Sequence, residues 1–189
     1  MDAMTQLRRL IAPLSARVAT MLSRAVLRAI NDAGGFQLVQ VGMRQGELRD
    51  DVEHFQPYGL TFRPLEGAQA VVAYLGGCGN HPVALVVADP RHRLRGLEPG
   101  EVALYTDEGD KIVLKRGRTI EIETATLVVK ASGKMRVEAP QLEVTGEIID
   151  RVDSSGRSMS HMRQVYDSHT HPDAQGGNTG TPNQSTGGA

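Results

Sequence analysis

The segment that decides the fold is residues 118–149, RTIEIETATLVVKASGKMRVEAPQLEVTGEII. Apolar and polar residues alternate in it through four short units, TIEIET, TLVVKA, KMRVEA and QLEVTG. A period of two is typical of β-strands that have one buried face and one face in water. Four such units in succession predict a weak internal repeat of the solenoid kind, built from short strands.

A single copy of this segment lacks the means to fold alone. Each strand offers only two sizeable apolar side chains, no helix follows to cover them, and the outer strands would leave unpaired edges. Winding around two other copies brings the apolar faces together on a three-fold axis and pairs every edge. We therefore expect an intertwined, trimeric, triple-stranded β-helix over residues 116–153. Glu121 and Glu123 then belong to its outer face, rather than to acid–base machinery.

Residues 1–33 are predicted to form an N-terminal helix. Between residues 4 and 30 apolar side chains recur at spacings of three and four, which defines one stripe on a helix that Gly34 and Gly35 would end. Pro13 is expected to kink the helix or to shift its start. The polar face carries arginines, so membrane or nucleic-acid binding is one interpretation, but we expect the stripe to pack on a partner. Two partners remain open: sister copies in a three-helix bundle, or another protein.

From residue 34 to residue 115 the pattern changes to short β-type runs separated by Gly, Pro and Asp. Five or so strands in about 80 residues predict a small barrel, for which an OB-fold is a natural size match. Glu108 and Gly109 mark a hairpin. The expected strands lie in the runs FQLVQVGM, AQAVVAYLGG, HPVALVVAD, GEVALYTDEG and KIVLKRG.

Composition limits the classes of function. The chain has 189 residues, a net charge of −1 and one cysteine, Cys78, which excludes an internal disulfide and a cysteine-based zinc framework. No apolar run would span a bilayer, and arginines interrupt any signal-peptide core, so we expect a soluble protein made in the cytoplasm. An OB-fold nucleic-acid-binding protein is the alternative function. The balanced charge, the scattered aromatics and a basic cluster confined to a loop, RHRLR, argue against it.

Residues 154–189 are predicted to form a small apex domain with a metal site. The segment SMSHMRQVYDSHTH has apolar residues at helical spacing, so one short helix is expected to lead into His169 and His171. Residues two apart in an extended segment point the same way, and the two imidazoles can therefore reach one metal together. The polar tail beyond them would be disordered in isolation, and we expect neighbouring chains or bound ions to hold it.

Two histidines do not complete a coordination shell, but a three-fold axis does. Three chains supply six imidazole nitrogens, an octahedral set that suits iron or nickel better than zinc. With no open position the site would be structural, stapling three chain ends together. A metalloenzyme using the same pair is the rival interpretation, but no nucleophile or general base is recognisable, so we expect no enzyme activity. The other histidines are predicted to be surface or turn residues: His54, His81, His92 and His161.

Several segments resemble the central spike, or baseplate assembly protein V, family of contractile-tail bacteriophages, most closely its Mu-like kind. The resemblance covers most of the chain. It implies an OB-fold domain, a triple-stranded β-helix and a small apex, and so a mainly β architecture. It is carried by RPLEGAQAV, LEPGEVALY, the alternating IEIETA and LEVTGEI units, SMSHMRQVYDSHTHP and the ending GGNTGTPNQ.

The resemblance also implies a function. Members of this family are trimeric spikes at the centre of the baseplate, below the tail tube, and sheath contraction drives them through the host outer membrane. Carried over, the family's axial iron, one per trimer, would be bound by His169 and His171, and calcium or chloride can also occur in the apex. The helix and OB domain would contact the hub and tail tube proteins during baseplate assembly. We therefore expect a virion structural protein, assembled in the host cytoplasm, with no nucleic-acid partner.

Overall fold

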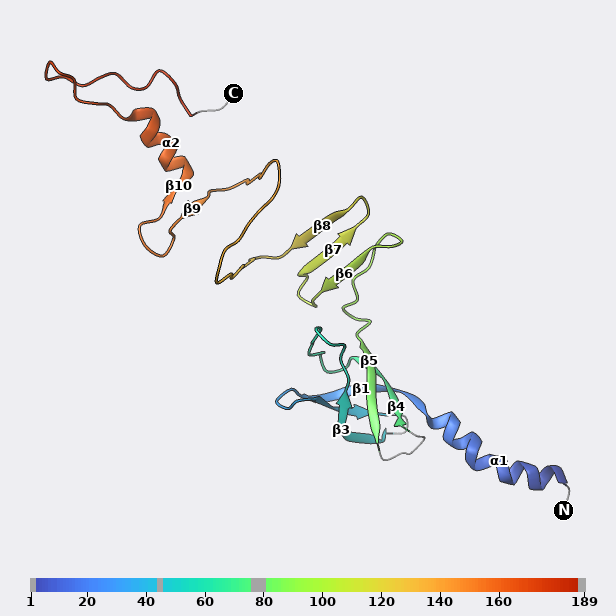
Figure 1. Ribbon diagram of the computed structural model, residues 1–189. Coiled ribbons are helices and arrows are strands. Elements are labelled where there is room, and N and C mark those ends of the chain that lie inside the picture. Colours follow the sequence, from blue (N-terminus) through green and yellow to red (C-terminus); the bar gives the residue numbers. More distant parts are fainter. Residues whose placement is uncertain (1–2, 44–45, 76–80, 187–189) are drawn as a thin grey trace. The chain divides into compact units, whose positions relative to one another are not determined.

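The computed structural model describes residues 3–43, 46–75 and 81–186, and these are mainly β, with a helix near each end (Figure 1). The chain divides into two compact units, Met1–Val128 and Val129–Ala189. The first unit holds a helix, a closed barrel and a three-stranded sheet, and the second holds a two-stranded sheet and a helix. Neither of the helices in the described residues is long and apolar enough to cross a bilayer.

The N-terminal helix, α1, spans Ala3–Thr20 and contains Pro13. It is shorter than the helix predicted for residues 1–33. The chain leaves it at Met21, whose carbonyl accepts a hydrogen bond from the amide of Tyr74 in the barrel (2.9 Å). This bond ties the end of α1 to the barrel.

The second half of the predicted helix is instead strand β1, Leu22–Asn31. Ala25 and Leu27 lie in the barrel core and are 2% and 0% exposed. The apolar residues of this segment also fit a helical stripe, which is why the prediction was wrong here. Hydrogen bonding to a strand on each side holds the segment extended, so tertiary pairing overrides the local pattern.

Five strands close a barrel in the order β1-β2-β3-β5-β4 (Figure 1). Neighbouring strands are antiparallel except β3 and β5, which pair in parallel. The predicted small barrel is therefore present. The remaining strands are β2 Gln37–Gly42, β3 Leu48–His54, β4 Gln69–Tyr74 and β5 Pro82–Ala88. The core consists of Ala25, Leu27, Val39, Val41, Val52, Ala68, Ala70, Val72 and Ala84.

The strands of this barrel are not the five predicted. Strands β2, β4 and β5 match expected runs, but β1 comes from the predicted helix, and β3 comes from a segment to which the pattern assigns no strand. The runs at residues 102–105 and 111–115 lie outside the barrel, in a separate sheet. Strand β3 is difficult to predict because Asp51, with a left-handed φ of 53°, interrupts its alternation.

His54 corrects the prediction that it lies at the surface. It ends β3, is 2% exposed, and its Nδ1 lies 2.9 Å from Oε1 of Gln37. The side-chain nitrogen of Gln37 donates to Oδ1 of Asp32 (2.7 Å) and to the carbonyl of Phe62 (3.2 Å). The oxygen of Gln37 therefore faces the imidazole, and Nδ1 donates the hydrogen bond. Burial lowers the pKa of His54, which favours the neutral ring.

Beyond the barrel, β6 (Val102–Tyr105), β7 (Lys111–Lys115) and β8 (Thr119–Glu123) form a three-stranded antiparallel sheet. The β6–β7 hairpin turns through Glu108 and Gly109, which confirms the predicted hairpin. Gly109 has a φ of 102°, in the left-handed region that suits glycine. Strand β8 is the first of the four predicted repeat units.

The other three repeat units lie within residues 124–148, which the structure describes throughout, and they form no strand in a single chain. Every residue from 122 to 157 is exposed. A strand requires a hydrogen-bonded neighbour, and one copy of this segment offers none. The triple-stranded β-helix therefore stays a prediction.

In the second unit, β9 (Ile149–Asp150) pairs with β10 (Arg157–Ser158), and the chain continues directly into helix α2 (Met159–Ser168). This confirms the short helix predicted before the histidine pair. Ser158 is the N-cap of α2: its hydroxyl accepts a hydrogen bond from the amide of His161 (3.2 Å).

The polar tail folds back on α2 within its own chain. The carboxylate of Asp167 accepts hydrogen bonds from the amide (2.8 Å) and the hydroxyl (3.0 Å) of Thr186. The prediction that only neighbouring chains or bound ions would hold this tail is therefore wrong at Thr186, which its own chain holds.

Candidate functional site

His169 follows α2 directly, and the helix end fixes its backbone. Its amide donates to the carbonyl of Val165 (3.0 Å), and its ring Nδ1 lies 2.6 Å from the carbonyl oxygen of Tyr166. A carbonyl oxygen only accepts, so Nδ1 carries the proton and the lone pair of Nε2 is left for a metal. A histidine ligand is usually oriented in this way, by a hydrogen bond from its other ring nitrogen.

His171 is positioned by a turn of the tail. Its amide donates to Oγ1 of Thr179 (2.9 Å), and its carbonyl accepts from the amide of the same residue (2.8 Å). Within the turn, Oδ1 of Asp173 accepts hydrogen bonds from the amides of Gln175 and Gly177 (both 2.9 Å). The chain's own hydrogen bonds therefore fix the backbone on each side of His171.

The structure brings the two predicted metal ligands together. The ring centroids of His169 and His171 are 5.0 Å apart, with their planes at 88°. Two imidazoles, one with its Nε2 oriented for ligation, are a donor set that transition metals accept, so these residues fit the metal that the family resemblance implies. Within residues 3–43, 46–75 and 81–186, no group of three or more His, Cys, Asp or Glu is placed to hold a metal ion. The role of the pair as ligands stays a prediction.

An apolar pocket of about 320 Å³ lies along α2, next to His169. The larger apolar side chains of α2 are all between 43% and 56% exposed, so a single chain leaves about half of their surface in water. The residues that line the pocket are Arg157, His161, Met162, Val165, Tyr166 and His169.

One face of the β6–β7–β8 sheet is wholly aliphatic. Strand register places its side chains in two cross-strand rows of three, and each of them is between 37% and 66% exposed. A hollow of about 330 Å³ lies at one end of the same face. We call this surface the aliphatic face; it consists of Val102, Leu114 and Ile120 in one row and Leu104, Ile112 and Ile122 in the other.

The opposite face of this sheet carries charged pairs on either side of Val113, which is 3% exposed. Nζ of Lys115 lies 2.6 Å from Oε2 of Glu121, and Nζ of Lys111 lies 2.7 Å from Oε2 of Glu123. The hydrogen bond from Lys115 holds the pKa of Glu121 below its usual value, and the same bond raises the pKa of Lys115. Both glutamates therefore lie on the polar face of their strand, as predicted.

Comparisons with known proteins place this chain among bacteriophage proteins. A family model described as Bacteriophage Mu Gp45, N-terminal, matches residues 24–91. The baseplate puncturing device gp45 of Escherichia phage Mu is 43% identical over 143 residues, which cover 75% of this chain and 72% of that protein. The chain belongs to the Mu gp45 family. Mu-like prophage FluMu protein gp45 of Haemophilus influenzae is 38% identical over 152 residues, covering 77% of this chain and 82% of that protein.

The family assignment confirms the Mu-like resemblance recognised in the sequence. The matched residues 24–91 of this Mu gp45 family member begin inside β1 and end just after β5, so the family model corresponds to the barrel. The longer alignments to the two relatives extend beyond the length of the barrel.

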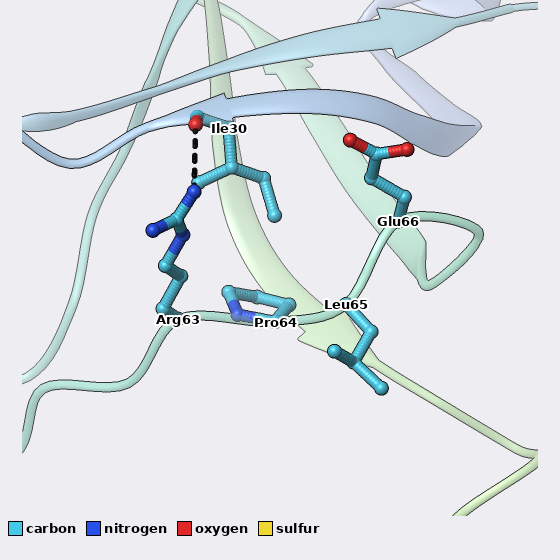
Figure 2. A pocket seen from close by; sticks show the side chains of 5 residues that line it. All are labelled: Ile30, Arg63, Pro64, Leu65 and Glu66. Carbon is cyan, nitrogen blue, oxygen red and sulfur yellow. Dashed lines mark hydrogen bonds between the residues drawn. The ribbon is translucent and has the colours of Figure 1, made fainter.

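The barrel of this family member carries a further pocket, of about 480 Å³ (Figure 2). Nη2 of Arg63 donates to the carbonyl of Ile30 (3.4 Å), and Figure 2 shows Glu66 on the other side of the pocket from this guanidinium. The remaining described residues that line it, Pro64 and Leu65, are apolar. A carboxylate and an engaged guanidinium held apart do not form an acid–base pair, so this pocket does not suggest an active site.

The basic loop weighs against the nucleic-acid alternative. In the cluster at residues 91–95, Nε and Nη2 of Arg91 bond the carboxylate of Asp89 (2.9 and 2.6 Å), and Nη2 also donates to the carbonyl of Glu66 (2.8 Å). The hydrogen bond from Arg91 lowers the pKa of Asp89 to about 2. One cation of the cluster is therefore neutralised within the chain, instead of facing a phosphate backbone.

Sequence reasoning missed two features of these surfaces. The aliphatic face extends over β6 and β7, where VALY and KIVLK show the same period of two as the repeat units. His54 stands two residues after the buried Val52, which places both side chains on one face of β3. In both cases the alternation was present in the sequence and was not used.

Proposed function

We propose that this chain is the homotrimeric central spike of a contractile phage or phage-like tail baseplate. Sheath contraction would drive this spike through the outer membrane of the host. A relative at 43% identity is named a baseplate puncturing device, and this supports the same role for this chain. The observation that carries the proposal is the aliphatic face together with the exposed stretch at residues 122–157.

Three copies would account for this exposed apolar surface. The aliphatic face and the apolar side chains of the repeat units are too extensive to be left in water by a stable monomer. Strands β6 and β8 also lie at the open edges of their sheet, where unpaired N–H and C=O groups await a neighbour. In the trimer the aliphatic faces meet on the axis, edges pair between chains, and the Lys–Glu face stays in water.

The proposed action is mechanical and needs no catalytic group. A piercing tip must be narrow, resistant to unfolding and free of loose ends. Strands wound around two other copies have no free edges, and they unfold only if all three chains separate. The charged outer face keeps the needle soluble before it is used.

His169 and His171 of three copies would hold one transition metal, for which iron is our candidate. The metal would supply structural cross-linking of three chain ends. The protein's own part is orientation: the carbonyl of Tyr166 fixes the ring of His169, and Thr179 fixes the backbone of His171. The barrel and α1 would face the hub and tail tube, and the chain would be part of the virion after assembly in the host cytoplasm.

Native mass spectrometry with metal analysis on the same sample tests this proposal. We expect a species of three chains that carries one tightly bound metal. His171→Ala should keep three chains and lose the metal, whereas His161→Ala, an exposed histidine in the same unit, should keep both. A folded monomer would overturn the spike. A trimer in which His171→Ala binds metal as well as the unaltered chain would overturn the site alone.

A further inference from the structure

Helix α1 carries a seven-residue repeat of apolar side chains. The spacings between successive members alternate strictly between three and four residues, which is the pattern of a coiled-coil seam. Met4, Ile11 and Val18 take position a of this heptad, and Leu7 and Leu14 take position d. We call these five residues the seam.

The seam is exposed in the chain by itself. Each of its five side chains is between 49% and 63% exposed. The barrel buries its own core without any residue of α1. The surface that Leu7, Ile11, Leu14 and Val18 expose is therefore large enough to pack against another molecule.

The width of the seam favours another helix over a flat surface. Two apolar positions in seven form a narrower stripe than a helix that packs against a globular core, which uses about three. Leu10, at position g, is the one large apolar side chain beside it. Pro13 stands at position c, away from the seam, so a helix partner would not meet the proline ring. No Trp, Tyr or Phe occurs in α1 to anchor it at a membrane surface.

We propose that α1 associates with the α1 helices of sister copies through this seam, as a parallel, in-register coiled coil. The proposal rests on the proposed function, because the trimer supplies the sister copies. All charged residues of Ala3–Thr20 are arginines. In a parallel coil, position g of one helix faces position e of its neighbour five residues further on, and none of these pairs places two arginines opposite each other. Charge is therefore compatible with self-association in this orientation.

Attachment of each α1 to the rest of the trimer explains why so short a seam is sufficient to form a coiled coil. An 18-residue helix spans about 27 Å, which is less than the three to four heptads of a coil that is stable alone. Joining the helices to one trimer raises their effective concentration. Isoleucine and valine at a with leucine at d are also the residues of two-stranded coils, so the trimer, not the seam, sets the number of strands. The hydrogen bond from Tyr74 to Met21 fixes where the coil leaves the barrel.

Disulfide trapping tests the coil in the full chain. In a Cys78→Ser background, Leu14→Cys places a thiol at d, and Ala12→Cys places one at b on the outside of the coil. Thiols at d in a parallel coil lie within the Cα separation that a disulfide needs, whereas those at b do not, so we expect Leu14→Cys to form cross-linked pairs at least about tenfold faster. Leu7→Cys and Thr5→Cys form a second d and b pair, for use where Leu14→Cys fails to fold.

Native mass spectrometry of the same samples separates the two proposals. Selective cross-linking at d within a trimer supports the coil. A trimer in which the d and b thiols cross-link equally, or not at all, overturns the coil and leaves the spike standing. A monomer overturns both. Sedimentation of the full chain with phosphatidylglycerol vesicles, abolished by Leu14→Asp, would also overturn the coil because it would assign the seam to a membrane.

Discussion

The barrel and the β6–β7–β8 sheet have the same alternation of apolar and polar residues, but they differ in whether one chain buries the apolar side chains. In the barrel, alternate residues such as Val39 and Val41 point into a core that one chain closes, and they are 1% and 0% exposed. In the β6–β7–β8 sheet, alternate residues such as Ile120 and Ile122 point equally regularly to one face but are 66% and 50% exposed. The difference lies in closure: five strands return on themselves in the barrel, whereas the sheet has two open edges.

This comparison shows that alternation predicts strands but does not say which molecule completes the fold. The barrel closes its ring of strands and buries a core within one chain. The segment from β6 to β9, which the structure describes throughout, has the apolar side chains of a core, but Val113 is the only one of them that a single chain buries. We expect the barrel to be stable as a monomeric unit of the chain, and the later segment to depend on other copies.

The most disruptive change to this division is a charge on the aliphatic face. Ile122→Asp would place three carboxylates, one from each copy, in the apolar interior of the proposed trimer. Burial of unpaired charge costs several kcal/mol per copy, so we expect the chain to become monomeric by native mass spectrometry at micromolar concentration. Glu123→Asp, on the charged face of the same strand, is the matched control and should remain trimeric. An Ile122→Asp variant that still forms a trimer would show that the aliphatic face is not the interface.

A cavity in the barrel core should destabilise the barrel and leave the trimer intact. Leu27 is fully buried and lies in β1 between two paired strands. Leu27→Ala is expected to lower the free energy of unfolding of the barrel by about 2–5 kcal/mol, as followed by chemical denaturation, and to leave three chains in the native mass spectrum. Loss of the trimer in this variant would mean that the barrel and the segment from β6 to β9 fold as one unit and are not independent.

How far the sequence predicts this fold depends on where each strand finds its neighbours. Strands β2, β4 and β5 follow from local runs, and so do the β6–β7 hairpin and helix α2. Strand β1 does not, because its apolar residues fit a helical period as well as an extended one and only the partners on each side decide. The last three repeat units show the converse: their alternation is clear, but one chain cannot supply the neighbours that make them strands.

The sequence likewise predicts only part of the candidate metal site. The spacing of His169 and His171 predicts that the two rings lie together, and the structure places them 5.0 Å apart. The carbonyl of Tyr166, which orients the ring of His169, was not predictable from the motif, because it depends on how α2 ends. Thr179, which holds His171, lies in a tail that appears featureless in composition.

Acid should affect the barrel through His54. Burial holds the pKa of His54 below its usual 6.5, so the folded barrel binds fewer protons than the unfolded chain. Its contribution to stability is complete above pH 6.5 and is lost as the pH falls through the lowered pKa, with a slope of at most about 1.4 kcal/mol per pH unit. Denaturation of the barrel between pH 7.5 and 5 measures this slope.

Two histidine variants identify the source of that slope. His54→Gln keeps a donor for Gln37 and removes the titrating ring, so its unfolding free energy should change less over the same range. His92→Gln, in an exposed loop, should behave like the unaltered chain. An unaltered slope in His54→Gln would mean that another group titrates, and that the buried imidazole is not the acid-sensitive part of the barrel.

The smallest effect is expected at the charged face of the sheet. Nζ of Lys115 and Oε2 of Glu121 are 2.6 Å apart, but their side chains are 40% and 42% exposed, so water and salt screen the pair in a monomer and on the outside of a trimer. Glu121→Gln should therefore leave the oligomeric state and the thermal unfolding midpoint within experimental error, at low and at high salt. The lowered pKa of Glu121 means that any contribution of the pair is present at neutral pH and is lost only in acid. A large loss of stability at neutral pH would place this pair inside the assembly. The aliphatic and charged faces would then have to exchange roles, and the comparison with the barrel would fail at its central point.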